Sequence, residues 1–307
     1  MSKIKFRSVG ECMAELQQAK EGLYSLAFGG DTLNTCWYVR ALTSSETFEV
    51  EYVTALGSDR LSRDLQTFLG GNGIGTGFVR AVPDRNIGLY LITLDGAERS
   101  FTYWRNNSAA RLLAHDPEHL AKALSGADIV YFSGITLAIL SEADRGILFT
   151  QLKKLRSDGV TIAFDSNTRP KLWASKTEMQ AATMLGYQAA TIALPTFSDE
   201  QALFDDASIT DCAARIASYG VAEVMVKNGA DAVLGLVNGK AFEVTPALVE
   251  RLVDTTGAGD SFNAGYLVAR TRNLPPAEAC RYAHQVAGKV ISHRGALAPT
   301  PLFADMR

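Results

Sequence analysis

The sequence lacks the marks of several large protein classes. Its four cysteines stand far apart and form no Cys-x-x-Cys pair, so we expect neither disulfides nor a cysteine-based metal cluster. Lys and Arg (30) nearly balance Asp and Glu (33), and the net charge of −3 gives no general attraction to nucleic acid or to an anionic membrane. Long apolar runs are missing and charges interrupt the N-terminal segment, which predicts a cytoplasmic protein without a signal peptide.

Two nucleotide-binding fingerprints are missing as well. Neither G-x-G-x-x-G nor G-x-x-x-x-G-K-[S/T] fits any glycine run of the chain. Their absence argues against a dinucleotide-dependent oxidoreductase and against a Walker-type ATPase. What the chain does have is 307 residues, 47% of them hydrophobic, which suits one large α/β domain.

Apolar strands alternate with amphipathic helices after residue 117. Strands are predicted at 129–132, 160–164, 191–194 and 221–227, with helices between them. This alternation predicts an α/β fold whose central, mainly parallel sheet is flanked by helices. Ligands of such folds bind at the carboxyl ends of the strands.

Residues 88–105 have a different character. Two runs rich in β-branched and aromatic residues surround an Asp-Gly pair, which predicts a β-hairpin. Alternation places Phe101, Tyr103 and Arg105 on one face of it. These three side chains either line a lid over an anionic ligand or form a packing set with Arg105 in solvent.

The turn Gly257-Ala258-Gly259-Asp260 stands between an apolar segment, expected to be extended, and a helix-like run. Small residues let a ligand approach the backbone, and the N–H groups and dipole of a helix start favour an anion. Asp260 could simply cap the helix. Alternatively, the three small residues hold phosphate charge while Asp260 takes the proton of an attacking hydroxyl. The flanking Asp254 favours the second interpretation.

Similar chemistry is indicated at two other places. Gly30 precedes a second predicted helix on which Asp31 and Asn34, three residues apart, could contact the hydroxyls of a sugar. Polar residues also follow three predicted strands, where one rim of the sheet would gather them. Among them, Arg169 could bind a carboxylate and Lys227 could approach nucleotide phosphates. The three segments are Asp165–Arg169, Thr196–Glu200 and Lys227–Gly229.

The segments Gly29–Asn34 and Asp254–Gly265 resemble the two signatures of the ribokinase-like (PfkB) carbohydrate kinases, in the same order and separation. The resemblance covers essentially the whole chain. It implies a single ribokinase-like domain over residues 1–307, with a small β-sheet lid inserted at about 11–30 and 86–107. It also implies ATP as phosphoryl donor and Mg²⁺. Where the apolar face of the lid sheet lies open in one subunit, it seeks a partner, so we expect a homo-oligomer formed through the lid.

The same resemblance assigns residues to roles. Asp260 would be the base, in a catalytic turn with Gly257, Ala258 and Gly259. The residues expected to bind substrate are Gly30, Asp31, Asn34, Tyr90, Tyr103, Arg105, Arg169 and Asp260. Those expected to bind nucleotide are Asn167, Lys227, Gly229 and His284 together with the turn, with the stretch Ala283–Gly295 near adenine.

Cation ligands follow from the resemblance less directly. Asp254 and Thr256 would hold a monovalent cation, K⁺, beside the anion-binding turn. Many relatives carry Asn-x-x-Glu at the position of Thr196–Glu200, where the acid orders Mg²⁺ through water. Asp199 and Glu200 are both candidates here, and Glu200 is the one that we assign.

Within the family, the closest likeness is to kinases of 2-keto-3-deoxygluconate, a six-carbon sugar acid. The lid run Tyr103-Trp104-Arg105 and the segment Asp165–Pro170 carry this likeness. Arg105 and Arg169 would supply positive charge that a neutral sugar does not require. A sugar kinase of the fructokinase or ribokinase type, and a non-catalytic sugar-acid sensor on the same fold, remain as alternatives.

Overall fold

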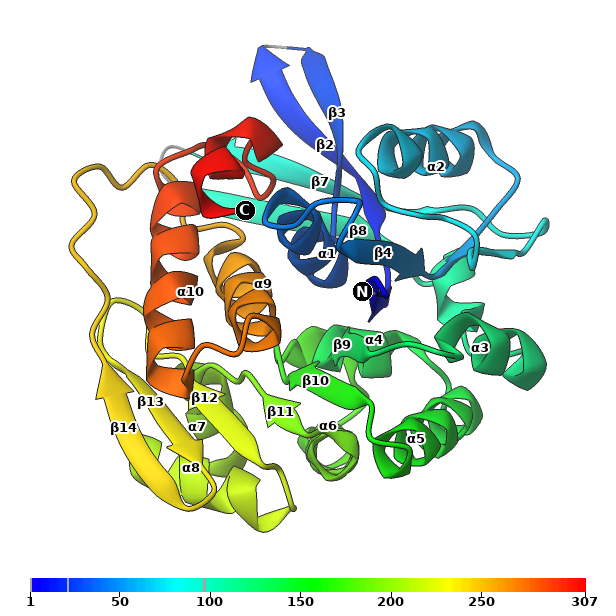
Figure 1. The fold of residues 1–307 in the computed structure, drawn as a ribbon. Coiled ribbons are helices and arrows are strands. Elements are labelled where there is room, and N and C mark those ends of the chain that lie inside the picture. The colour runs from blue at the N-terminus through cyan, green and yellow to red at the C-terminus, as the bar shows by residue number, and fades with distance from the viewer. Residues whose placement is uncertain (1, 21, 96–97) are drawn as a thin grey trace.

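An eight-stranded sheet runs through the centre of the molecule (Figure 1). The computed structural model describes residues 2–20, 22–95 and 98–307. In sheet order the strands are β14 (Lys240–Val244), β13 (Val233–Val237), β12 (Glu223–Val226), β11 (Ile192–Ala193), β10 (Thr161–Asp165), β9 (Ile129–Ser133), β1 (Ile4–Val9) and β4 (Phe48–Val53). The six from β12 to β4 are parallel, and β13 and β14 add an antiparallel edge. The predicted central, mainly parallel sheet is confirmed.

Helices cover both faces of this sheet. They are α1 (Asp31–Ala41), α2 (Arg60–Gly71), α3 (Pro117–Leu124), α4 (Gly134–Ile139), α5 (Glu142–Ser157), α6 (Lys176–Ala189), α7 (Phe197–Phe204), α8 (Ile209–Ser218), α9 (Ala258–Thr271) and α10 (Pro276–Ile291), with 3-10 turns η1 (Ala109–Leu112), η2 (Pro170–Leu172) and η3 (Thr300–Met306). On β9, Ile129 and Tyr131 belong to the core under α1, α9 and α10, whereas Val130 and Phe132 belong to the core under α3, α5 and α6. The two-residue period of a strand thus divides one apolar run between two cores.

Local signals explain which helices the sequence predicts. The carboxylate of Asp116 accepts from the amides of Glu118 and His119, and Pro117 occupies the first helical position, so α3 begins where its sequence indicates. Helix α7 has no side-chain cap at Thr196, and its first turn reads from the sequence as a polar loop. Helix α4 has only six residues, too few for a recognisable helical period.

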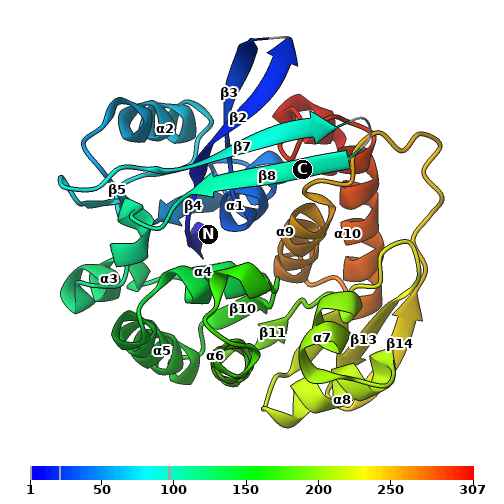
Figure 2. The ribbon, with the colours of Figure 1, turned by 180° about the vertical axis from the view of Figure 1, so that it is seen from behind.

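A second sheet of four strands stands apart from the first. It has the order β3 (Leu23–Gly29), β2 (Met13–Lys20), β7 (Gly88–Asp95) and β8 (Glu98–Trp104). The predicted hairpin forms between β7 and β8, with Tyr90 opposite Tyr103, although residues 96 and 97 of its turn lie outside the described part. Figure 2 shows these strands crossing one end of the molecule. All four fall within the segments expected for the lid, whose separate role stays a prediction.

The apolar residues before the catalytic turn do not form the extended segment that the sequence suggests. Residues 245–257, all of them described, form neither helix nor strand. The side chains of Leu248, Leu252 and Val253 are exposed. The amide of Val253 donates to the carbonyl oxygen of Ile291 (2.8 Å), which ties this segment to the end of α10.

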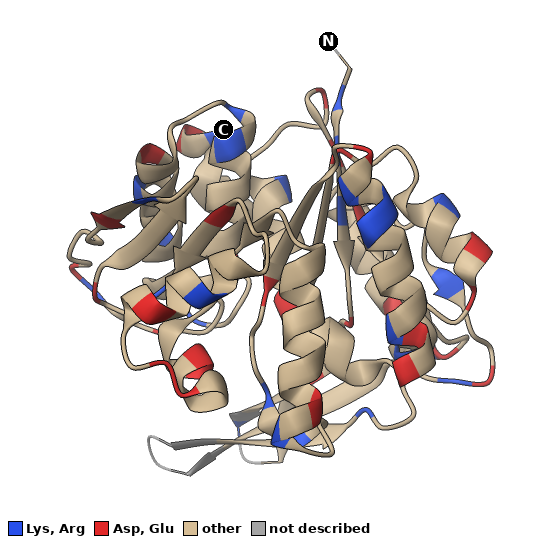
Figure 3. Cartoon of the chain, turned by 90° about the horizontal axis from the view of Figure 1, so that it is seen from below, with Lys and Arg blue, Asp and Glu red and all other residues tan. Residues whose placement is uncertain are grey.

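The surface carries charges of both signs. Figure 3 shows basic and acidic segments interspersed over the outward helices, in keeping with the small net charge. Among the described residues, no helix combines the length and apolar character needed to cross a bilayer. All four cysteines are buried and free.

Candidate active site

The starts of α1 and α9 meet, and this meeting point forms the centre of the site. The side-chain amide of Asn34 donates to Oδ2 of Asp260 (2.8 Å), and the hydroxyl of Thr35 donates to the Asp260 carbonyl oxygen (3.2 Å). Each helix begins after a glycine, Gly30 or Gly257. Two positive helix ends therefore face the same space, where an anion is stabilised.

The shape of the catalytic turn depends on glycine and on a distant segment. Gly257 has φ +79°, and a Cβ there would lie 2.8 Å from the carbonyl oxygen of Ala296. Oδ2 of Asp254 accepts from the amide of Gly295 (2.9 Å), and the hydroxyl of Tyr38 donates to the Ala296 carbonyl (2.6 Å). The stretch 295–296 thus supports the turn from outside, and only glycine leaves room for it.

A buried polar network forms the floor below the turn. The ammonium of Lys227 donates to Oδ2 of Asp165 (2.8 Å) and to Oδ1 of Asn263 (3.0 Å). The amide of Asn263 also donates to Asp165 (2.6 Å) and to the hydroxyl of Tyr131 (3.1 Å). A Cβ on Gly259 would lie 3.5 Å from the Lys227 ammonium. One positive charge therefore lies beside the first turn of α9.

The carboxyl group of Asp260 is tuned toward proton exchange near neutral pH. Burial, followed by the negative charges of Asp31 and Asp165, raises its pKa to about 7. The hydrogen bond from Asn34 and the charge of Lys227 act in the opposite direction. A carboxylate with a pKa near the working pH is suited to general base catalysis.

Asn167 joins the substrate side of this centre. Its amide donates to Oδ2 of Asp31 (2.6 Å), and its backbone amide donates to Oδ1 of Asp165 (3.1 Å). Its φ of +29° lies in the left-handed region, which asparagine tolerates better than most residues. The sequence analysis assigns Asn167 to nucleotide binding. In the structure, its side chain instead contacts Asp31, a residue expected to bind the sugar.

Glu11 connects the four-stranded sheet to the central domain. Its buried carboxylate accepts hydrogen bonds from the guanidinium of Arg105 and from the hydroxyl of Ser108. A Cβ on Gly30 would collide with its carbonyl oxygen, and a Cβ on Gly88 would lie 2.9 Å from its Oε1. These contacts bring together all four places where the chain passes between the two sheets. We call this cluster, Glu11, Gly30, Gly88, Arg105 and Ser108, the lid root.

The two arginines expected to bind a substrate carboxylate have different environments. Arg105 is only 6% exposed and forms an ion pair with Glu11, which contradicts the alternative that placed Arg105 in solvent, and its contact with a substrate stays a prediction. The Arg169 side chain is 52% exposed; its guanidinium donates to the Thr168 carbonyl (2.6 Å) and lies 3.8 Å from Oδ2 of Asp199. Arg169 is therefore the freer of the two.

The candidate tyrosines lie together on the four-stranded sheet. The Tyr90 hydroxyl donates to Glu15, and its ring lies 5.9 Å from that of Tyr103. Tyr103 is half exposed and stacks on Phe101. A groove of about 740 Å³ opens at the lid root and is lined in part by Tyr103 and Arg105, but Asp260 does not line it.

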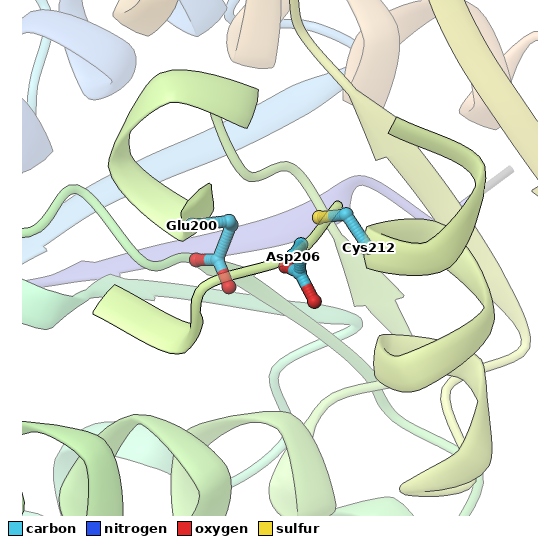
Figure 4. A group of neighbouring side chains, drawn as sticks. All are labelled: Glu200, Asp206 and Cys212. Atoms are coloured by element: carbon cyan, nitrogen blue, oxygen red, sulfur yellow. The ribbon is translucent and has the colours of Figure 1, made fainter. Parts of the chain in front are cut away.

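The acidic pair on α7, Asp199 and Glu200, separates into an outer and an inner residue, and the inner one, Glu200, lies beside Asp206 and Cys212 (Figure 4). Glu200 is fully buried and accepts from the Tyr187 hydroxyl (2.6 Å) and the Arg215 guanidinium (2.8 Å). With Asp206 and Cys212 it forms a cluster whose cation is already Arg215. The assignment of Glu200 to Mg²⁺ does not fit this placement.

Asp199 is the alternative that the structure favours. It lies on the outer side of α7 and accepts from the Thr168 amide (3.2 Å). Burial and the charge of Asp165 raise its pKa, while Arg169 and Lys227 lower it, so its carboxylate is within electrostatic reach of the site. Mg²⁺ prefers such oxygen ligands and keeps much of its water.

The remaining candidates have mainly structural contacts. Oδ1 of Asp254 accepts from the amide (3.0 Å) and hydroxyl (2.7 Å) of Thr256. His284 packs edge-on against Phe262, with Nε2 3.3 Å from the Val244 carbonyl, and burial lowers its pKa. Gly229 turns the chain after β12 with φ +62°. The assigned roles of Asp254, Thr256, His284 and Gly229 stay predictions.

Two residues of the site were not selected from the sequence. Asn263 lies three residues after Asp260, so helical spacing alone places both on one face of α9. Glu11 directly follows the end of β1 and Gly10, where the strand-end rule would have found it. Both signals were present, but each requires a distant partner before it has chemical meaning.

Comparisons with known proteins agree with the family resemblance given by the sequence motifs. A family model described as pfkB family carbohydrate kinase matches residues 3–302. The chain is 41% identical to a 2-dehydro-3-deoxygluconokinase of Haemophilus influenzae, covering 97% of this chain and 96% of the relative. It is 40% identical to the enzyme of that name from Escherichia coli K12, covering 97% and 98%.

Solved structures share the fold at lower identity. One is an Escherichia coli protein described as a ribokinase II, in complex with ATP and Mg²⁺. It superposes with a TM-score of 0.84 at 21% identity, over 96% of this chain and 95% of that one. This likeness concerns the fold, and it supports the ribokinase-like arrangement of a central sheet with a smaller one.

Proposed function

This chain belongs to the pfkB family of carbohydrate kinases, and on that premise we propose that it phosphorylates 2-dehydro-3-deoxygluconate, also named 2-keto-3-deoxygluconate. ATP would be the donor and 2-dehydro-3-deoxy-6-phosphogluconate the product. The observation that carries this proposal is Asp260, held at the start of α9 by Asn34 with its pKa raised to about 7. The relatives that share about 40% identity over nearly the whole chain bear the name of this activity.

Asp260 acts as the general base in this proposal. Its carboxylate accepts the proton of the terminal hydroxyl, whose oxygen forms a bond to the γ-phosphorus as the bond to the β-phosphate oxygen breaks. Asn34 fixes the orientation of the carboxylate through the 2.8 Å hydrogen bond. Asp31 and Asn167, joined at 2.6 Å, supply acceptor and donor groups for sugar hydroxyls.

The turn Gly257–Gly259 and Lys227 hold the phosphates. Amides in the first turn of α9 and the dipole of this helix stabilise the charge that develops on the transferred group. Lys227, held by Asp165 and Asn263, adds a positive charge beside Gly259. Mg²⁺ would supply further charge neutralisation, and Asp199 is the residue that would hold it through water.

Arg169 and the lid root select for an acid substrate. The half-exposed side chain of Arg169 can turn toward a carboxylate, since Asp199, its ionic neighbour among the described residues, is 3.8 Å away. Arg105 is held in place by Glu11 and would present its remaining N–H groups; its Nε is buried without a protein partner among the described residues. Tyr103, half exposed on the same sheet, adds a hydroxyl.

A second copy of the chain would cover the exposed apolar residues of the four-stranded sheet. Leu23, Tyr24, Leu26, Phe101 and Trp104 are each about half exposed or more. Such a surface on a small sheet favours pairing between copies. Sedimentation of the wild type and of Trp104→Glu tests this: a wild type that sediments as a monomer at micromolar concentration would contradict it.

A substrate panel tests the proposed activity. Purified protein with ATP and Mg²⁺ is expected to release ADP with 2-dehydro-3-deoxygluconate, and mass spectrometry should show one added phosphate on the sugar acid. Fructose and ribose serve as neutral controls, and protein without a sugar reports background hydrolysis. Turnover of fructose with none of the keto acid would make the chain a neutral-sugar kinase, and no turnover with either would favour a sensor.

A further inference from the structure

A second polar cavity lies at the far end of α1, away from the site described above. It has a volume of about 300 Å³ and lies between the end of α1, the turn after α2 and the start of η3. Its walls include Arg40, Arg307, Thr43, Ser44, Ser45 and Thr300. None of its lining residues, all of them described, is acidic. Two guanidinium groups and several hydroxyls are the groups that bind phosphate oxygens.

Among the described residues, no acidic side chain forms an ion pair with Arg40. The residue is 9% exposed, and its guanidinium donates to the Phe48 carbonyl (3.3 Å) and the Thr43 hydroxyl (3.1 Å). Neither Arg40 nor Arg307 forms an ion pair with any described residue. Burial and then the charge of Arg307 lower the pKa of Arg40. Buried charges are ordinarily paired, so this cavity has unused capacity for an anion.

Capping of α1 accounts for only part of this positive charge. Arg307 donates to the Ala41 carbonyl (3.0 Å), and Arg272 donates to the Leu42 carbonyl (2.8 Å). A helix end carries the equivalent of about half a negative charge. With Arg40 in the last turn, three guanidinium groups surround that end. Arg40 and Arg307 thus bring two guanidinium groups to a cavity whose lining has no acidic side chain.

We propose that this cavity binds a phosphate dianion, either free or as the phosphate group of a small phosphomonoester. A volume of about 300 Å³ is at the lower limit of small-molecule sites and accommodates a ligand of this size. Arg40 and Arg307 contact the phosphate oxygens, and the hydroxyls of Ser44, Ser45 and Thr300 complete the shell. This inference does not depend on the proposed kinase activity.

Binding of inorganic phosphate tests the proposal without any measurement of turnover. Calorimetric titration at low ionic strength is expected to show binding that Arg307→Gln weakens roughly tenfold, the loss of one charge-assisted contact. Arg307 is exposed, so this variant should fold. Arg60→Gln, which removes an arginine that is 80% exposed and outside the cavity, is the matched control and should bind as the wild type does.

Ser45→Glu provides an independent readout. Its carboxylate would occupy the cavity, abolish phosphate binding and raise the melting temperature by neutralising the arginines. Hydrogen exchange should localise the wild-type effect, with phosphate slowing exchange in 40–47. If Arg307→Gln and Ser45→Glu both bind phosphate like the wild type, or if protection is confined to the 254–262 turn, the proposal is wrong.

Discussion

Two carboxylates, Asp260 at the start of α9 and the buried Glu11 at the lid root, have opposite surroundings. Burial and the charges of two further acids disfavour the charged form of Asp260 and raise its pKa, although the hydrogen bond from Asn34 acts in the opposite direction. Glu11 receives a guanidinium and a hydroxyl, so its charge is matched. The same side-chain chemistry is therefore suited to proton transfer, as proposed for Asp260, where its charge is poorly balanced, and to a structural connection where its charge is well balanced.

Removing the base should have the largest effect on activity. Asp260→Asn keeps the shape but cannot accept the proton, so kcat should fall by about 10³ with little change in KM. Stopped assays of ADP release measure it. Asp64→Asn, on the exposed face of α2, is the control. If kcat of Asp260→Asn stayed within tenfold of the wild type, Asp260 would not be the base.

The same substitution should change stability in a pH-dependent way. The folded-state pKa of Asp260 lies above its ordinary value of 3.8, so the folded protein loses stability as the pH rises from about 3.8 through about 7. Asp260→Asn removes this loss. Its melting temperature should therefore exceed that of the wild type by more at pH 8 than at pH 5.

Disrupting the lid root should have the next largest effect. Glu11→Gln leaves the buried Arg105 without its counter-charge, which should destabilise the fold by about 3–5 kcal/mol and raise KM for the sugar acid. Denaturant unfolding and steady-state kinetics measure the two effects. Glu49→Gln breaks the 2.6 Å pair with buried Arg7, far from the lid, and is the matched control. An unchanged KM in Glu11→Gln would reduce the lid root to a purely structural cluster.

Substitutions at two neighbours of Asp260 should shift the acid limb of the pH–activity profile in opposite directions. The charge of Asp31 raises the pKa of Asp260, so Asp31→Asn should move the midpoint of kcat/KM to lower pH by about one unit. The hydrogen bond from Asn34 lowers that pKa, so Asn34→Ala should move it to higher pH. A pH profile from 5 to 9 checks the direction of both shifts. If both midpoints shift in the same direction, this account of the Asp260 pKa is wrong.

The smallest expected effect belongs to the exposed arginine. Arg169→Gln should raise KM for the sugar acid by about fivefold at most, because exposed charges contribute about 1 kcal/mol or less, and salt should reduce the difference. Lys176→Gln removes an exposed cation that pairs with Asp205 at 3.2 Å and should leave KM unchanged. A larger loss in Arg169→Gln than in Glu11→Gln would reverse the ranking of the two regions.

Local sequence signals predict much of the fold. Asp116 with Pro117 predicts the start of α3, and the apolar runs predict β9, β10 and β12. Local signals do not reveal α4, which has too few residues for a period, or α7, whose first turn reads as a loop. The sequence also does not show that the segment before Gly257 is irregular.

The candidate site divides along a similar line. The strand-end rule placed Asp165, Asn167 and Lys227 on one rim, where the structure has all three in contact with the floor network or Asp31. The identity of a partner far along the chain could not be predicted. Arg105 pairs with Glu11 from 94 positions away, and the buried Glu200 pairs with Arg215 of another helix, α8. Sequence spacing predicts where a residue lies, but it does not predict which charged side chain that residue contacts.

The support of the catalytic turn by its distant segment has a consequence for biosynthesis. Asp254 is hydrogen-bonded to Gly295, 41 positions later, and Ala296 lies against Gly257. In a chain emerging from the ribosome, the turn Gly257–Gly259 therefore gains this support only after residues 295 and 296 have been translated. A copy that ends before residue 295 would contain Asp31 and Asn34 but would lack the support of the proposed phosphate-binding turn.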